Sequence, residues 1–368
     1  MKWRLLLVLA CGGGLGAAAQ LGYRTYTESK SPPPRPERVK RLWVRSTTPE
    51  PFAEKHVAAF SPLPTVYAGR FSTPTPAEMD LGRQFFYDKR FSKNHDVSCN
   101  SCHPLLDYGM DNRGVSLGHV GQTGTRNAPS VYNAAGHGFQ FWDGRAEDVE
   151  AQAPMPVMDP FEMAMSEERL LATLRSIPEY AAALKRLYPE DRDPVSIKNF
   201  GKVIGAFERG LVTPSRWDDF LAGAPGALTP KEKAGFMMFR HLDCVSCHEG
   251  RLIGGGHFEA LGQVLPWPNQ TDKGRNPPGS QTPMFKVASL RNVAKTAPYF
   301  HDASAEDLPQ AVRLMAAHQL GLQVTDEQVD LVVTWLGTLT GDLPLHHIYQ
   351  PDLPESTAAT PKPTRDGH

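Results

Sequence analysis

The sequence carries almost no net charge and contains no long apolar run. Its 39 Lys and Arg residues nearly balance its 40 Asp and Glu residues, which leaves a formal net charge of −1. A chain so balanced has no electrostatic preference for nucleic acid or an acidic membrane surface, so we expect no nucleic-acid partner. The apolar run at residues 5–10 is short for a bilayer span, and three glycines at residues 12–14 interrupt its continuation. Nor does a long alternation of apolar and polar residues predict an extended sheet.

Cysteine is also scarce, and four of the five cysteines fall in two copies of the pentapeptide Cys-x-x-Cys-His. The copies are Cys99-Asn100-Ser101-Cys102-His103 and Cys244-Val245-Ser246-Cys247-His248. In this motif the two thiols add across the two vinyl groups of one porphyrin, and the adjacent histidine supplies an axial ligand to the iron. The sequence therefore predicts two covalently attached c-type haems.

A zinc site, a redox dithiol and a disulfide framework are alternative interpretations of these cysteines. A structural zinc site needs four converging ligands, whereas each cluster supplies three. A thioredoxin-type dithiol lies in a βαβ context, which the sequence does not show. Haem attachment is therefore the favoured interpretation.

The N-terminus has the form of a secretory signal, with Lys2 and Arg4 before the apolar run and small residues up to Ala19. We expect residues 1–26 to be a signal peptide or a membrane anchor. Cleavage after Ala19 is favoured, and lipidation at Cys11 is a further alternative. Each of these places the rest of the chain outside the cytoplasm, which agrees with haem attachment in the bacterial periplasm.

Two stretches rich in proline and charge flank the central part of the sequence. Residues 27–74 are expected to form a Pro-rich linker, and residues 346–368 a disordered tail. The chain contains 33 prolines and 32 glycines, which predict long irregular loops between the elements.

The central part contains an internal repeat of a helix followed by a haem motif. Thr75-Pro76-Ala77-Glu78 and Thr229-Pro230-Lys231-Glu232 each combine a capping Thr, Pro at the first helical position and Glu at the third. Gly82 with Phe86, and Gly235 with Phe239, follow the two caps. We therefore expect an all-α fold of two tandem cytochrome-c-like domains, residues 75–222 and 223–345.

Three further helices are expected from periodicity. Asp193 with Pro194 is expected to cap a helix that carries Ile197, Phe200, Ile204 and Phe207 on one face; Thr325 with Gln328 caps one that carries Val329, Val332, Val333 and Leu336; and Leu170, Leu171, Leu174 and Ile177 mark the third.

The second axial ligand of each iron decides between electron transfer and peroxide chemistry. The residues alone leave several candidates open. They are His119 and His137 in the first half, and Met284, Met315, His257, His301 and His318 in the second.

Longer segments of the chain resemble the bacterial dihaem cytochrome c peroxidases, a family that also includes the MauG-like enzymes. The resemblance runs from about residue 76 to residue 343. It is carried by residues 118–122 (GHVGQ), 126–130 (RNAPS), 140–146 (QFWDGRA), 285–293 (FKVASLRNV), 296–302 (TAPYFHD) and 315–321 (MAAHQLG).

The resemblance implies that the haem on His103 is the low-potential peroxidatic centre. His119 matches the histidine that blocks the distal face of this haem in the resting oxidised enzyme. Gln152 and Glu162 match the distal-pocket glutamine and the catalytic glutamate. A carboxylate in a partly apolar pocket can take a proton from peroxide and deliver one to the leaving oxygen.

The resemblance also implies that the haem on His248 is the high-potential centre where electrons enter, with Met315 as its axial ligand. A His/Met pair raises the potential of a haem. The MauG-like members have tyrosine at this position, so Met315, together with the presence of His119, favours the peroxidase branch. Trp142 matches the tryptophan that lies between the haems and assists electron transfer.

A calcium site is a further implication of the resemblance. Asn127, Thr296 and Pro298 match positions that contribute to it, the last two through backbone carbonyls, and oxygen ligands suit this hard cation. The family's members are commonly homodimers.

The predicted function is a periplasmic peroxidase that reduces hydrogen peroxide to water. The expected electron donor is a small c-type cytochrome or a cupredoxin. Two alternatives remain: a MauG-like enzyme that oxidises a protein substrate, and a non-catalytic dihaem electron carrier.

Overall fold

The computed structural model describes residues 42–364 apart from positions 47, 71 and 277–281. The expected signal or anchor at residues 1–26 and the candidate lipidation site Cys11 lie outside the described residues. Within residues 42–364, no helix is both long and apolar enough to cross a membrane.

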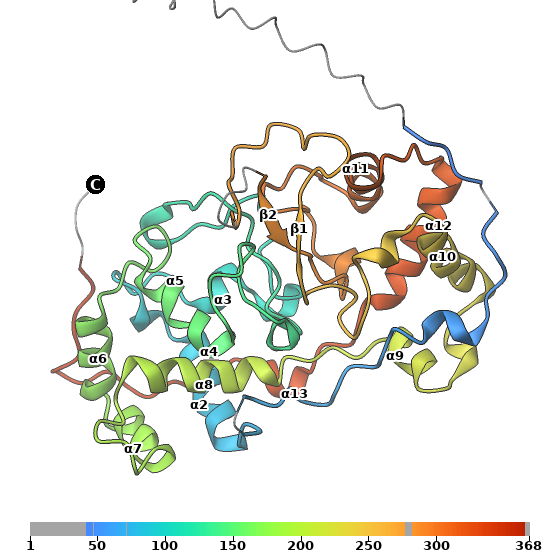
Figure 1. The fold of residues 1–368 in the computed structure, drawn as a ribbon. Coiled ribbons are helices and arrows are strands. Elements are labelled where there is room, and N and C mark those ends of the chain that lie inside the picture. Colours follow the sequence, from blue (N-terminus) through green and yellow to red (C-terminus); the bar gives the residue numbers. More distant parts are fainter. Residues whose placement is uncertain (1–41, 47, 71, 277–281, 365–368) are drawn as a thin grey trace, which may run out of the picture. The chain divides into compact units, whose positions relative to one another are not determined.

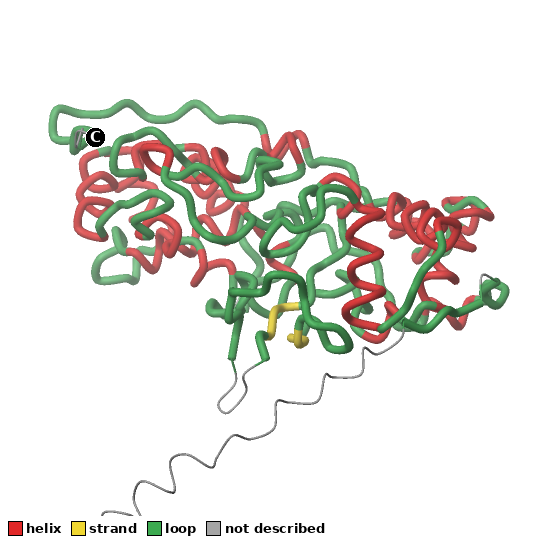
Figure 2. The backbone as a smooth tube through the Cα atoms, turned by 90° about the horizontal axis from the view of Figure 1, so that it is seen from above, coloured by secondary structure: helices red, strands yellow, loops and turns green. Residues whose placement is uncertain are grey.

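Helices joined by long loops form most of the described chain (Figures 1 and 2). The α-helices are α2 (Pro76–Tyr87), α3 (Cys99–Cys102), α4 (Val149–Gln152), α5 (Pro154–Met158), α6 (Glu167–Ser176), α7 (Pro178–Leu187), α8 (Ile197–Arg209), α9 (Arg216–Leu221), α10 (Pro230–His241), α11 (Leu308–Leu320), α12 (Asp326–Leu336) and α13 (Leu345–Ile348). Short 3-10 helices span Glu54–Val57, Lys89–Phe91, Leu105–Asp107, His119–Gly121, Ala134–Gly136, Pro225–Ala227, Cys244–Ser246, Val293–Lys295 and Gly337–Leu339.

Two short strands are the only sheet in the described part of the chain. Strands β1 (Phe258–Ala260) and β2 (Met284–Lys286) pair antiparallel, with Glu259 opposite Phe285. The expectation of a helical fold with long irregular loops is thus confirmed, apart from this pair of strands.

The two helix starts of the internal repeat are confirmed. The Thr75 and Thr229 side chains each accept a hydrogen bond from the backbone N–H three residues on, and the glutamates at these positions bond back to the cap. These capping boxes satisfy backbone donors that a helix start leaves free. Helices α2 and α10 therefore begin where the sequence places them.

The glycines that follow the two caps lie at helix crossings. A Cβ on Gly82 would lie 1.8 Å from the backbone oxygen of Val203 in α8. A Cβ on Gly235 would lie 2.2 Å from the backbone oxygen of Leu331 in α12. Figure 1 shows α2 beside α8, and α10 beside α12. The same small-residue contact thus joins the corresponding helices of the two halves.

The other helix expectations are confirmed except in their ends. Thr325 caps α12 by accepting from the backbone N–H of Gln328. The expected cap of α8 was wrong, because Ser196 caps it and Asp193 instead accepts from Val195 N–H. Helix α6 ends one residue before Ile177, which is fully buried beyond it.

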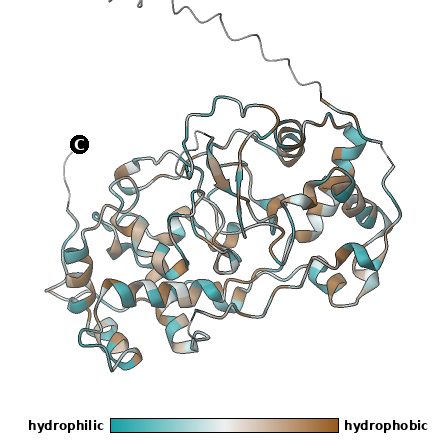
Figure 3. Cartoon of the chain, viewed as in Figure 1, coloured by the Kyte–Doolittle hydropathy of each residue, from teal (hydrophilic) through white to brown (hydrophobic). Residues whose placement is uncertain are grey.

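Two large apolar cores hold most of these helices. The first surrounds Phe85 and Phe200, whose rings stack 5.4 Å apart. The second surrounds Trp217, Phe236 and Trp335. Burying these side chains is the main stabilising contribution to each core. In Figure 3 the helices carry both hydrophobic and hydrophilic residues, as amphipathic helices around a core do.

The expected linker and tail were wrong for the residues that the structure describes. Phe60 is 8% exposed, and its ring contacts Trp217 at 5.7 Å, so residues 42–74 contribute to the second core. In the C-terminal segment, Thr360 is buried and Thr357 donates to the backbone oxygen of Ser176. Aromatic burial and hydrogen bonds fix these segments despite their proline content.

Candidate functional site

The first Cys-x-x-Cys-His motif lies on the wall of a cavity of about 190 Å³. One helical turn, α3, sets Cys99 and Cys102 three residues apart, and the His103 N–H bonds to the backbone oxygen of Cys99. His103 Nδ1 lies 3.0 Å from the backbone oxygen of Gly109. This contact orients the ring and leaves Nε2 free to bind a metal.

The second motif repeats this arrangement at a cavity of about 300 Å³. Cys244 opens a 3-10 turn, and the His248 N–H bonds to its backbone oxygen at 3.0 Å. His248 Nδ1 lies 3.2 Å from the backbone oxygen of Ile253. Both motifs therefore combine two thiols with one oriented imidazole at a cavity.

The protonation states of these groups suit haem attachment. Burial lowers the pKa of His103, and it lowers the pKa of His248 to about 4, so both rings are neutral. Neutral imidazole is the form that binds iron. The four motif cysteines are free thiols. The residues present therefore fit two c-type haems, each held by two thioether bonds and one axial histidine.

Gln152 and Glu162, the predicted distal-pocket residues, both line the first cavity. Gln152 ends α4, and Glu162 follows α5 in a turn where its N–H bonds to the backbone oxygen of Asp159. Burial is the main cause that raises the pKa of the Glu162 carboxyl; the Asp159 charge adds to it and the Arg145 charge opposes it. Such a carboxyl can hold or release a proton nearer to neutral pH.

His119 is brought close to Glu162 through its backbone. The His119 N–H donates to the Glu162 backbone oxygen at 2.6 Å. A Cβ on the preceding Gly118 would lie 2.1 Å from the backbone oxygen of Phe161, so glycine permits this crossing of two loops. The His119 side chain is 7% exposed, and its Nδ1 lies 3.8 Å from Asp96 Oδ2. It is not among the residues that line the first cavity.

Met315 lies in α11 and lines the second cavity with His248. Of the other candidates for a second ligand, His301 lines this cavity and His137 lines both. Met284, His257 and His318 line neither. Met315 and His301 thus share the second cavity with His248, and Met315 stays the predicted axial ligand of the second haem.

Trp142 belongs to a wall that the two cavities share. Its indole N–H donates to the backbone oxygen of Asn127 at 2.8 Å, which fixes the ring. The residues that line both cavities are Asn127, Pro129, Ser130, His137, Phe141, Trp142 and Lys286. Trp142 thus lines both sites, and its role in electron transfer stays a prediction.

The three residues of the expected calcium site all line the second cavity. Asn127 is 4% exposed, and its side-chain amide donates to the backbone oxygen of Arg113 at 2.8 Å. Thr296 and Pro298 follow the 3-10 helix Val293–Lys295. The side-chain oxygen of Asn127 and two backbone carbonyls would supply the ligands.

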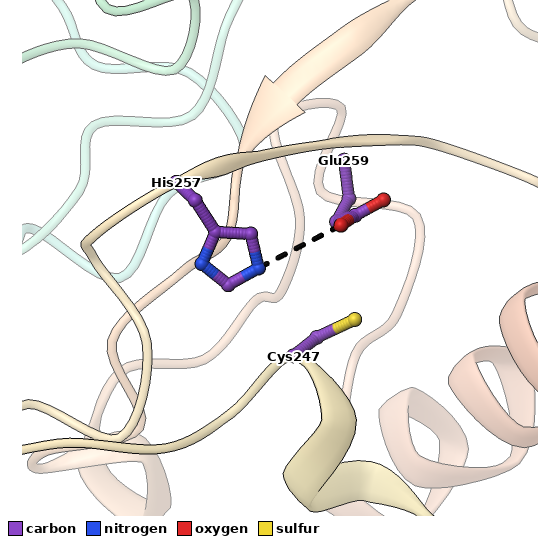
Figure 4. A group of neighbouring side chains, drawn as sticks. All are labelled: Cys247, His257 and Glu259. Carbon is purple, nitrogen blue, oxygen red and sulfur yellow. Dashed lines mark ion pairs between the residues drawn. The ribbon is translucent and has the colours of Figure 1, made fainter.

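Another group of metal-ligating side chains lies beside the second motif (Figure 4). The ligand atoms of Cys247, His257 and Glu259 lie within 4.8 Å of one another, and His257 Nε2 is 3.7 Å from Glu259 Oε1. A thioether bond to haem would occupy the Cys247 sulfur. The two remaining ligands do not make a closed metal site.

Two ionisable residues of the cavity walls escape prediction from the sequence. Glu208, in α8, lines the first cavity, and burial raises the pKa of its carboxyl to about 8. Lys286, in β2, is 7% exposed. The neighbouring Phe207 and Phe285 are the only local sign in the sequence that either group lies in an apolar environment.

The fold and the site define a dihaem c-type cytochrome with two unequal haem sites that share a wall. A family profile described as "Di-haem cytochrome c peroxidase" matches residues 76–225. The Pseudomonas aeruginosa cytochrome c551 peroxidase is 39% identical over 318 residues, which cover 83% of this chain and 90% of the relative. The Nitrosomonas europaea cytochrome c551 peroxidase is 39% identical, with 83% and 91% covered.

The chain therefore belongs to the dihaem cytochrome c peroxidase family, as the sequence resemblance predicted. MauG relatives also match: that of Methylorubrum extorquens is 34% identical and covers 64% of this chain and 67% of the relative. Among solved structures, a MauG-like protein associated with microbial copper homeostasis aligns with a TM-score of 0.68 and 26% identity, covering 78% of this chain and 97% of that one.

Proposed function

We propose that this protein is a periplasmic peroxidase that reduces hydrogen peroxide to water. The expected electron donor is a small c-type cytochrome or a cupredoxin, and the expected assembly is a homodimer. The observation that carries the proposal is that different functional side chains line the two haem sites. Glu162 and Gln152 line the first cavity, and Met315 lines the second. Family membership supports the same function.

The haems, when bound, supply the iron that exchanges electrons with peroxide and donor. Glu162 takes a proton from bound peroxide and returns it to the leaving oxygen, because its carboxyl has a raised pKa and faces the first cavity. The Gln152 amide orients the peroxide by hydrogen bonding. Because of these two residues, peroxide reduction is proposed to take place in the first cavity, beside His103.

Electrons are proposed to enter at the site of His248 and Met315 and to pass Trp142. The hydrogen bond between the indole and Asn127 holds this ring in the shared wall. Calcium at Asn127, Thr296 and Pro298 would stiffen the same region. The matching crossings at Gly82 and Gly235 support two tandem cytochrome-c-like domains, residues 75–222 and 223–345, one on each side of this wall.

Substitution of Glu162 by Gln tests whether this carboxyl transfers the protons of peroxide reduction. General acid–base catalysis contributes about 10²–10⁴ in rate, so peroxide turnover with a reduced donor should fall by at least about 100-fold. Both haems should still be attached, as pyridine haemochrome spectra would show. Glu190→Gln, at an exposed position, is the matched control. Wild-type turnover in Glu162→Gln would remove this residue from the mechanism, and an inactive wild type would favour an electron carrier.

The position of His119 bears on the MauG-like alternative. Its side chain lies beside Asp96 rather than on the cavity wall. In a MauG-like enzyme, the first haem must lack the His119 ligand already in the ferric state. Electron paramagnetic resonance distinguishes the two functions: a low-spin ferric first haem that becomes high-spin on half-reduction supports the peroxidase. A high-spin ferric haem with little turnover of reduced cytochrome supports the MauG-like function.

A further inference from the structure

The wall between the cavities contains a buried ammonium group without a carboxylate partner. Lys286 lines both cavities, and its Nζ lies 3.0 Å from the backbone oxygen of Phe139 and 2.9 Å from His137 Nδ1. Among the described residues, no Asp or Glu forms an ion pair with it. Burial lowers the pKa of this ammonium to about 8, yet at neutral pH it is still mostly charged. A buried cation of this kind ordinarily has an anionic partner.

His137 presents a second unsatisfied group at the same place. An ammonium can only donate, so His137 Nδ1 must accept, and the ring proton lies on Nε2. Burial, with a smaller effect of the Lys286 charge, lowers the pKa of His137 and keeps the ring neutral. Nε2 is buried and has no hydrogen-bond partner in the described part of the chain. It is therefore a donor that needs an acceptor.

The backbone around the pair leaves room for this arrangement. A Cβ on Gly255, which has φ +78°, would lie 2.7 Å from the His137 ring, so only glycine allows the ring to lie there. The Lys286 backbone N–H donates to the Trp142 backbone oxygen at 2.8 Å. These contacts fix the ammonium and the imidazole beside Trp142.

We propose that Lys286 and His137 form a carboxylate-binding site that holds a propionate group of one haem in the wall between the two cavities. A carboxylate supplies the negative charge that Lys286 lacks and the acceptor that His137 Nε2 lacks. This inference rests on the proposed attachment of two haems. Both residues line both cavities, so either haem could supply the carboxylate.

The site has a measurable electrostatic consequence. A fixed positive charge beside a haem favours the state with one more electron, so it raises the potential of that haem. Removal of the charge should lower that potential, whereas a purely structural role of Lys286 would change thermal stability and leave both potentials where they are. The potential therefore separates the two roles.

The experiment is a spectroelectrochemical titration of the holoenzyme that resolves the two haems. Lys286→Met should lower the potential of one haem so that its ferric–ferrous equilibrium changes by about tenfold, which is 59 mV for a one-electron couple. Lys286→Arg, which keeps the charge, should retain most of the wild-type value. Lys198→Met, which removes an exposed lysine of α8, should change neither potential. The haem that responds is the one whose propionate is held.

His137→Phe provides a second test that keeps the lysine. It should lower the potential of the same haem by a smaller amount, because only a neutral donor is lost. Potentials in Lys286→Met that match those of Lys198→Met overturn the proposal. Should Lys286→Met fail to take up haem, unchanged potentials in His137→Phe overturn it. The titration uses no peroxide, so absence of peroxidase activity would contradict the proposed function and leave this result standing.

Discussion

At the scale of single residues, the chemistry of the first site depends on the surroundings of one carboxyl group. Glu162 lies in a turn with Asp159, whose charge raises its pKa, while the charge of Arg145 lowers it, and burial outweighs both. The turn persists because Asp159 Oδ1 accepts from the backbone N–H of Phe161 at 2.8 Å. Neighbouring charges can therefore adjust this group while the fold is kept.

The acid limb of the pH profile should move in opposite directions in two variants. If Glu162 acts first as a base, kcat/KM for peroxide falls as the pH drops through its raised pKa. Asp159→Asn removes a negative charge but keeps the turn acceptor, so the pKa falls and the limb moves to lower pH. Arg145→Gln removes a positive charge, so the limb moves to higher pH. Displacement of both in the same direction would contradict Glu162 as the titrating base.

At the scale of elements, the two glycine crossings fix how the helices of each half pack. Gly82 and Gly235 allow the backbones of α2 and α8, and of α10 and α12, to touch. The helix that carries each glycine leads toward a haem motif, so this contact also places the cysteines. Close-packed interiors tolerate little added volume at such a contact.

Alanine at either crossing should destabilise the protein strongly. The new Cβ would lie 1.8 Å from Val203 O in Gly82→Ala and 2.2 Å from Leu331 O in Gly235→Ala, so the helices must separate. Overpacking costs about 1–3 kcal/mol, and we expect the upper part of that range in urea unfolding. Gly337→Ala is the control, because it is helical with no atom within 4 Å of the added Cβ. Equal stability of all three variants would show that the crossings do not determine packing.

At the scale of the whole molecule, segments distant in sequence hold the first half together. Residues 351–364 run against it: Arg90 Nη1 donates to Pro354 O at 2.8 Å, and Thr357 bonds to Ser176 O at 2.8 Å. Thr360 Oγ1 also accepts from Ser176 at 3.0 Å. Residues 351–364 line neither cavity.

A chain that ends after residue 350 should be less stable but remain active. Each hydrogen bond contributes about 0.5–1.5 kcal/mol net, so the loss of these contacts should lower the unfolding free energy by about 2 kcal/mol. Peroxide turnover at low temperature should equal that of the full chain. A chain that ends after residue 364 is the control. A loss of turnover without a loss of stability would indicate that the C-terminal segment acts on the site itself.

The sequence by itself determined the local features: the two Cys-x-x-Cys-His turns, the capped starts of α2, α10 and α12, and, through long matching segments, the family. These depend on residues within a few positions of one another. The tertiary structure alone decided three further features. They are the position of Glu162 at the first cavity, the pairing of Lys286 with His137 across 149 positions, and the burial in residues 351–364. Such features depend on contacts between segments that are distant in the sequence. In the sequence, the ionisable residues of these segments look like ordinary surface groups, because only folding buries them away from water.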